Sequence, residues 1–122
     1  MKLYLKFREL IISKDHILLP KKIYKDYGDF EEVNVPWGKQ AAKIKTVRIL
    51  DSVKSNCMRN WFMDFVNLTI LIDFQNLDVS DCKDFYCMFW NCSNLQDLIS
   101  LQNLDVSNGK DFVGIFCYKK CS

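Results

Sequence analysis

The stretch that decides the fold is QNLDVSDCKDFYCMF at residues 75–89, because it returns as QNLDVSNGKDFVGIF at residues 102–116. The two copies lie 27 residues apart and share ten of their fifteen positions. A fixed period of this length is typical of stacked architectures, in which each unit packs its apolar face on the next. We therefore expect equivalent side chains to form columns, such as Phe62 on Phe89 on Phe116.

A weaker copy precedes these two. Shifting the pattern back by 27 residues matches Leu50 and Asp51 with Leu77 and Asp78. The same shift matches residues 67–68 and 71–72 with residues 94–95 and 98–99. The chain thus carries two full periods and two partial ones.

Each period is predicted to contain a short helix, a strand and a loop. Phe85, Met88 and Phe89 have the i, i+3, i+4 spacing of one helix face, which predicts a helix over residues 83–91 with Ser80 as its N-cap. Strands are predicted over residues 68–72 and 95–99, and connecting loops over residues 75–79 and 102–106. In the loops, Leu77 and Leu104 should point inward and Asp78 and Asp105 outward.

The N-terminal part is predicted to cover the first copy. Residues 2–12 begin with alternating polar and apolar side chains and KIKTVRIL at 43–50 is rich in β-branched residues, so both are expected to be strands. Proline and glycine punctuate residues 13–43, which predicts loops and turns there. We expect an α/β solenoid of about three 27-residue strand-loop-helix repeats, with residues 1–42 as an N-terminal β cap and residues 43–122 as the repeat array.

Composition excludes several classes of protein. The chain has 122 residues, of which 49% are hydrophobic, so it can form one packed domain. Its net charge of +2 is too small to indicate a nucleic-acid partner. No segment approaches the ~18 apolar residues that a membrane span requires. The start is no signal peptide, because charges at Lys2, Lys6, Arg8 and Glu9 interrupt every apolar run.

The six cysteines leave two interpretations open. Disulfides such as Cys87 with Cys117 or Cys57 with Cys82 could join adjacent copies, but buried free thiols are the favoured interpretation without a signal peptide. A zinc site is not expected, because Cys117 and Cys121 have no partner pair at suitable spacing. The remaining cysteine is Cys92.

No cofactor and no enzymatic activity are expected. His16 is the only histidine, and neither a nucleophile motif nor a glycine-rich phosphate loop accompanies it. The periodic Asp78 and Asp105, with Asp51 before them, suggest calcium, but each period supplies only one acidic loop residue. Bonds from these carboxylates to backbone amides near the following serine are the favoured interpretation.

The phrase MFWNCSNL at 88–95, with the NLDVS phrases, resembles the BspA-like leucine-rich repeat, which also occurs in mycoplasma-type surface lipoproteins. The likeness covers roughly residues 35–122 and includes VPW at 35–37 and NWF at 60–62. Nine residues fall on the family pattern: Asp78, Ser80, Met88, Phe89, Cys92, Leu95, Leu98, Asp105 and Ser107. The sequence departs from the pattern at Phe65, Phe85 and Phe112, at Lys83 and Lys110, and around residues 118–120.

The resemblance implies a leucine-rich-repeat-like solenoid that acts as a non-enzymatic protein-binding or adhesion module of a bacterial-type surface protein. The alternative is an intracellular protein-interaction module with the same fold. In such solenoids the sheet face usually binds the partner, a protein of unknown identity here. The predicted outward positions are Thr46, Arg48, Thr69, Ile70, Gln96 and Asp97. Tyr86, Trp90 and Tyr118 are further candidate anchors. The chain stops just before the next strand is due, so we expect an exposed apolar end and a fragment of a longer array or a degenerate member.

Overall fold

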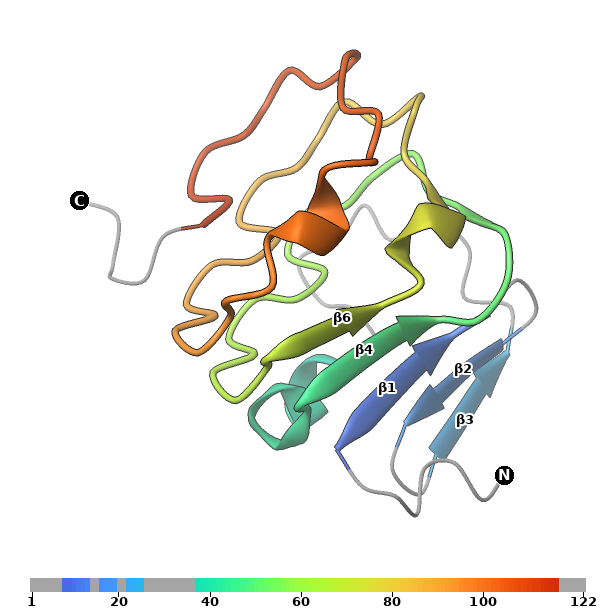
Figure 1. Cartoon of the computed structure of the whole chain (residues 1–122), viewed down its shortest axis with the longest axis vertical. Helices are drawn as coiled ribbons and strands as arrows, with labels where there is room; N and C mark the ends of the chain where they lie inside the picture. The colour runs from blue at the N-terminus through green and yellow to red at the C-terminus, as the bar shows by residue number, and fades with distance from the viewer. Residues whose placement is uncertain (1–7, 14–15, 20–21, 26–36, 117–122) are drawn as a thin grey trace.

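The computed structural model describes residues 8–13, 16–19, 22–25 and 37–116. Five strands form one sheet, and Figure 1 shows them side by side in the order β3-β2-β1-β4-β6. These strands are β1 (Glu9–Ile12), β2 (His16–Leu19), β3 (Lys22–Lys25), β4 (Thr46–Ile49) and β6 (Ile70–Ile72). A second sheet pairs β5 (Val53–Lys54) with β7 (Leu77–Asp78). The 3-10 helices are η2 (Gly38–Lys43), η3 (Phe74–Asn76) and η4 (Ile99–Leu101).

One face of the large sheet forms part of the core, and on the other face Ile11, which pairs with Arg48, is buried as well. β1, β4 and β6 run parallel to one another, and β2 and β3 follow as an antiparallel extension. In β4 the apolar Val47 and Ile49 are buried, whereas Thr46 and Arg48 lie on the outer face. Alternation of this kind is what a half-buried strand requires, and it turns the apolar side of the sheet toward the core.

Three turn segments lie at residues 57–66, 84–93 and 111–116, and the first two contain every buried phenylalanine of the described residues except Phe74. Within each segment, bonds join residues three apart, such as Met88 N–H to the Phe85 carbonyl at 3.2 Å and Trp90 N–H to the Cys87 carbonyl at 3.1 Å. The N–H groups between these donors bond the next segment instead: Phe62 N–H donates to the Met88 carbonyl at 2.8 Å. Figure 1 shows the segments as loops rather than coiled ribbons.

The predicted strand-loop-helix solenoid, and with it the leucine-rich-repeat fold, is therefore wrong. In the described residues no α-helix forms over 83–91, because alternate N–H groups that a helix would use point to the neighbouring segment. Ser80 consequently caps no helix. Within the described residues, helix is limited to short 3-10 turns, of which η2, with six residues, is the longest. The described part of the protein is mostly strand and loop.

The sheets also correct the predicted alignment of the first copy. Val53 pairs with Leu77, and Thr46 pairs with Ile70, so the spacing between these partners is shorter than the period of the two full copies. Leu50 is exposed whereas Leu77 is buried, and Val53 and Lys54 rather than Leu50 and Asp51 pair with Leu77 and Asp78. The full period starts only at Cys57, which forms a parallel bridge with Asp84, and Asp84 forms one with Asp111.

The core is built around aromatic side chains. Trp37, Trp61 and Phe65 are buried with Phe62, whose ring lies 5.2 Å from that of Phe89. Phe89 in turn stacks on Phe116 at 5.6 Å, so the predicted phenylalanine column is confirmed. Phe85 and Phe112 form a second column, at 5.2 Å with ring planes only 3° apart.

Predictions for the other elements had mixed outcomes. The strand expected over 43–50 is present as β4, that over 68–72 is present in part as β6, and that over 95–99 is absent. Of the strand expected over 2–12, residues 9–12 form β1 and residues 1–7 lie outside the described part. The β2–β3 hairpin occupies a region that was expected to be loops. The division of the chain near residue 42 stays a prediction, and the large sheet extends across it.

Candidate functional site

The two ends of the column of turn segments differ. We call the end next to Trp37 the covered end. There the Trp37 ring lies 5.2 Å from that of Trp61 and 6.4 Å from that of Phe62. Its indole Nε1–H donates to the Trp61 carbonyl, and Ser55 Oγ–H donates to the Cys57 carbonyl at 2.7 Å. Side chains thus take up outward-facing backbone carbonyls of the first turn segment.

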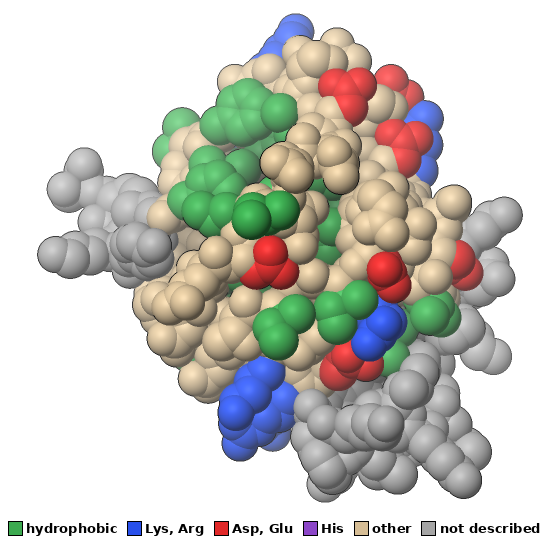
Figure 2. Space-filling model, viewed as in Figure 1, with side chains coloured by type: hydrophobic (Ala, Val, Ile, Leu, Met, Phe, Trp, Pro, Cys, Tyr) green, Lys and Arg blue, Asp and Glu red, His purple; other side chains and the backbone are tan. Residues whose placement is uncertain are grey.

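The opposite end, between η4 and the third turn segment, is apolar and uncovered within the described residues. We call it the open end. It exposes 54% of Leu98, 48% of Phe116 and 40% of Phe112. Figure 2 shows hydrophobic side chains gathered over the third turn segment, seen there as green atoms. An apolar patch of this kind on a soluble domain marks a candidate interaction surface.

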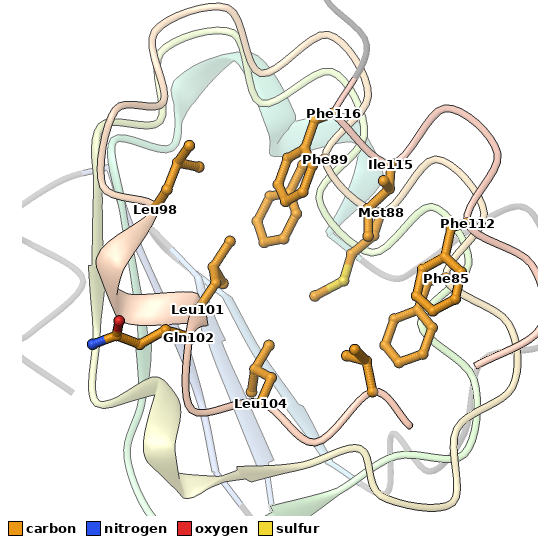
Figure 3. A pocket seen from close by; sticks show the side chains of 11 residues that line it. Phe85, Met88, Phe89, Leu98, Leu101, Gln102, Leu104, Phe112, Ile115 and Phe116 are labelled. Carbon is orange, nitrogen blue, oxygen red and sulfur yellow. The ribbon is translucent and has the colours of Figure 1, made fainter. Parts of the chain in front are cut away.

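The open end is hollowed. A cavity of about 450 Å³ lies between Leu98, Leu101 and Leu104 on the η4 side and the phenylalanine columns on the other side. Figure 3 shows the stacked pairs Phe89–Phe116 and Phe85–Phe112 facing those leucines. A concave, almost wholly apolar site can hold an apolar side chain of a partner, but it presents no group that could perform chemistry.

Gly109 leaves room for the Phe112 ring, which forms part of the cavity lining. A Cβ atom built at Gly109 would lie 2.2 Å from Cζ of Phe112, so any larger residue would displace that ring. The glycine therefore allows Phe112 to lie flat against Phe85. This contact was not visible in the sequence, where Gly109 stands at the position of Cys82 one period earlier.

The structure places only some of the residues of the predicted binding face on or beside paired strands. Thr46 and Ile70 pair across β4 and β6, and Ile70 is 49% exposed. Arg48 forms ion pairs with Glu9 at 3.5 Å and with Asp73 at 3.8 Å. Thr69 and Gln96 are also exposed. Four of the six predicted residues therefore lie on or beside two paired strands, whereas Gln96 and Asp97 belong to no strand of the described chain.

Asp97 ends the sheet instead of extending it. Its carboxylate accepts the Leu71 N–H of β6 at 3.3 Å, and Ser100 Oγ–H donates to the Leu71 carbonyl at 3.3 Å. The Ser100 hydroxyl also lies 3.0 Å from the Asp97 carboxylate, so its one proton is shared between the two acceptors. Side chains thus occupy the backbone groups that another strand would need, which protects this edge from pairing.

Arg59 joins the turn segments on their polar side. Its Nε–H donates to Asp84 at 2.7 Å, its Nη2 lies 3.7 Å from Asp111, and its guanidinium lies 4.3 Å above the Tyr86 ring. The bond to Asp84 raises the pKa of Arg59. Tyr86, a predicted anchor, is therefore engaged within the molecule. Trp90 is half-buried, and Tyr118 lies outside the described residues.

The periodic aspartates have the predicted structural role. Asp78 accepts the Ser80 N–H at 3.0 Å and the Ser80 Oγ–H at 2.6 Å, and Asp105 does the same with Ser107 at 3.1 and 2.6 Å. These bonds lower the pKa of both carboxyls. Within residues 8–13, 16–19, 22–25 and 37–116, no three potential metal ligands gather in one place.

The described cysteines are buried, reduced thiols. These are Cys57, Cys82, Cys87 and Cys92, so the alternative Cys57–Cys82 disulfide does not form, and Cys117 lies outside the described part. Burial raises the pKa of Cys82 to about 11 and that of Cys92 to about 12. Cys92 Sγ–H donates to the Phe62 carbonyl at 3.0 Å. These thiols serve packing and should react slowly in the native state.

No family model, curated protein or solved structure matches the chain. The resemblance to the BspA-like family therefore stays a prediction. In the part of the chain that the structure describes, no helix combines the length and the apolar character needed to cross a membrane.

Proposed function

We propose that this chain is a non-enzymatic protein-binding module whose partner occupies the open end. The observation that carries the proposal is the cavity of about 450 Å³, whose lining includes the exposed Leu98, Phe112 and Phe116. Protein interfaces gain most of their affinity from a few apolar or aromatic anchors that fill such pockets. The open end offers a pocket and exposed aromatic rings in one place.

The outer sheet face is the second candidate surface, because Ile70 is also exposed there. Two of its polar side chains, however, are already bonded within the molecule. Arg48 is already paired with Glu9 and Asp73, and Asp97 is bonded to β6. A partner would have to break these contacts before it gained new ones.

Two settings remain for this function. Display on a cell surface, where the module would serve adhesion, follows from the sequence resemblance. An intracellular setting is favoured by the reduced thiols at Cys57, Cys82, Cys87 and Cys92, because buried thiols outside disulfides are common where the environment is reducing. Alkylation of freshly isolated protein, with and without reductant, separates the two settings.

Site-specific crosslinking tests the binding surface. A photoreactive p-benzoylphenylalanine replaces Phe116 at the open end in one variant and Ile70 on the sheet face in another. In extracts of the native source we expect a discrete crosslinked protein with the first variant and none with the second. Equal crosslinking at the two positions, or a product only at position 70, would refute the proposal.

Affinity for the crosslinked protein, once purified, gives the quantitative test. Leu98→Ser and Ile70→Ser remove the same kind of exposed side chain from the two surfaces and form a matched pair. The proposal predicts that Leu98→Ser weakens binding by about tenfold and that Ile70→Ser leaves it unchanged. Gly109→Ala should also weaken binding, because it displaces the Phe112 ring without removing it.

A further inference from the structure

The backbone between the turn segments follows a regular bonding pattern. Alternate N–H groups of one segment donate to alternate carbonyls of the next. From the first segment to the second, the four donor and acceptor pairs are Met58–Asp84, Asn60–Tyr86, Phe62–Met88 and Asp64–Trp90. From the second to the third, they are Phe85–Asp111, Cys87–Val113 and Phe89–Ile115. All seven bonds run in one direction, from N–H to the following segment.

The third segment has the same backbone conformation as the other two. Gly114 is left-handed at φ 70°, like Cys87 at 51° and Asn60 at 61°, each at the equivalent position of its segment. Ile115 N–H donates to the Phe112 carbonyl at 3.2 Å, as Met88 N–H does to that of Phe85. The N–H groups of Phe112, Gly114 and Phe116 therefore face away from the second segment, and within residues 8–116 as described they meet no acceptor.

One carbonyl accompanies these donors. The N–H groups of Lys110 and Asp111 donate to the Lys83 carbonyl at 2.7 and 3.0 Å. Lys110 is the equivalent of Lys83 in the next copy, so its own carbonyl faces outward at the start of the same edge. The open end therefore presents one acceptor followed by three donors at alternate residues.

This order argues against a second copy of the chain as the occupant. Two copies related by a two-fold axis could exchange bonds between the Lys110 carbonyl and the Phe112 N–H, but Gly114 and Phe116 would meet no acceptors. Head-to-tail stacking fails as well, because Trp37 and Ser55 already occupy the Trp61 and Cys57 carbonyls at the covered end.

The side chains indicate what else the occupant must carry. Phe112 and Phe116 each stack on the preceding copy with one ring face and remain partly exposed. Residues four apart thus offer two flat apolar surfaces beside the donor row. A segment that continued the bonding pattern would place its own residues i and i+4 over these two rings.

We propose that the open end binds a segment of a partner protein that presents backbone carbonyls on alternate residues and aromatic side chains four residues apart. This inference rests on the function proposed above and specifies the chemistry of the partner. Recognition of this kind, in which main-chain bonds supply affinity and side-chain pockets supply specificity, is known from strand addition to exposed edges.

The probe for the test is a synthetic peptide with the sequence of residues 105–116, DVSNGKDFVGIF. In the protein this sequence already presents its carbonyls to the donor row of the second segment. Titration of the whole isotope-labelled chain with the peptide should shift the amide resonances of Phe112, Gly114 and Phe116 and slow their hydrogen exchange. The same peptide with both phenylalanines replaced by serine should bind at least about tenfold more weakly.

Two peptides with one ester bond each test the carbonyls directly. An ester carbonyl is a weaker hydrogen-bond acceptor than an amide carbonyl. An ester at the peptide residue that corresponds to Val113 should reduce affinity by about fivefold, because the carbonyl of this residue lies in register with the donors. An ester that weakens the next carbonyl toward the N-terminus should change affinity little. Equal effects would overturn the inference.

Other outcomes separate the inference from the proposed function. Peptide binding that shifts Leu98 and Ile99 but leaves the three amides unprotected would overturn the inference and leave the open end as the binding surface. Absence of binding at millimolar peptide would overturn it too. Protection without peptide would assign the edge to another occupant: a second copy if it grows with protein concentration, or the chain's own residues 117–122 if their removal abolishes it.

Discussion

The covered end and the open end show one sequence pattern in two environments. Phe62 and Phe116 are members of the same column, yet Phe62 is fully buried and Phe116 is 48% exposed. Trp37 lies beyond Phe62 and supplies both an aromatic ring and a hydrogen-bond donor. Beyond Phe116 the described chain supplies neither. Stacking alone therefore does not complete the column, because its last member needs a cover for its ring and for its backbone.

The edge of the large sheet also has its backbone groups covered by side chains. β6 is closed by Asp97 and Ser100, whose side chains bond the N–H and the carbonyl of Leu71. The covered end and the β6 edge, where further elements could add, are thus both protected by side chains. The edge at Phe112, Gly114 and Phe116 lacks such protection within the described residues, which is why we assign binding to it.

The largest expected effect comes from truncating the two ends of the phenylalanine column. Phe62→Ala should lower the free energy of unfolding by about 3–5 kcal/mol, because it opens a cavity in a fully buried site. Phe116→Ala should lower it by only about 1 kcal/mol, because half of the ring is already in water. Urea denaturation followed by fluorescence measures both. Similar losses for the two variants would show that the open end is covered in solution.

Trp37→Phe tests the donor at the covered end. The substitution retains an aromatic ring but leaves the buried Trp61 carbonyl without the indole N–H, which should destabilise the protein by about 1–3 kcal/mol. Urea denaturation again provides the measurement, and Trp90→Phe, at a half-buried position, is the matched control. If both variants lost equally little, the bond from Trp37 would not contribute to the covered end.

Closure of the sheet edge should have a smaller effect. Ser100→Ala removes the donor to the Leu71 carbonyl and should cost about 0.5–1.5 kcal/mol. Ser93→Ala, at an exposed position in the second turn segment, is the control and should cost less. Analytical ultracentrifugation adds a second measurement, because an unprotected edge invites association. Unchanged stability and no association in the Ser100 variant would show that Asp97 protects the edge alone.

The smallest effect concerns pH. Bonds from Ser80 lower the pKa of Asp78 in the folded state below its ordinary 3.8, so its contribution to stability is complete above that value and is lost as the pH falls through the folded pKa. Ser80→Ala removes the hydroxyl bond and should move the pKa of Asp78 upward. Carboxyl NMR titration measures this shift, with Asp105 beside the intact Ser107 as internal control. A shift in Asp105 alone would contradict the assignment.

Some of the fold could be predicted because the period assigns equivalent positions. The column Phe62–Phe89–Phe116 and the inward Leu77 follow from that equivalence without any knowledge of secondary structure. The helix over 83–91 could not be excluded in this way, because consecutive turns place apolar residues at the same i, i+3 and i+4 positions. The informative signals were Asn60 and Gly114 at one left-handed position of the period and Asp64 and Asn91 at another, since these residue types tolerate that conformation.

The candidate site was harder to predict because it depends on what is next to each residue. The sheet face seemed suitable while residues 95–99 were expected to form a strand, but Asp97 and Ser100 use their side chains to close β6. The first copy was misaligned because Val53 pairs with Leu77 at a shorter spacing than the later copies have, and too few identities mark it. The exposed apolar end itself was anticipated, although not its donor row.

Native-state hydrogen exchange, resolved by residue and measured on the whole chain, tests the difference between the two ends most directly. The account predicts strong protection of the amides of Phe85, Cys87 and Phe89, which donate to the third turn segment. It predicts fast exchange, near that of an unstructured peptide, for Phe112, Gly114 and Phe116. Equal protection of the two groups in the isolated monomer would contradict the account, because the edge assigned to a partner would then already be occupied.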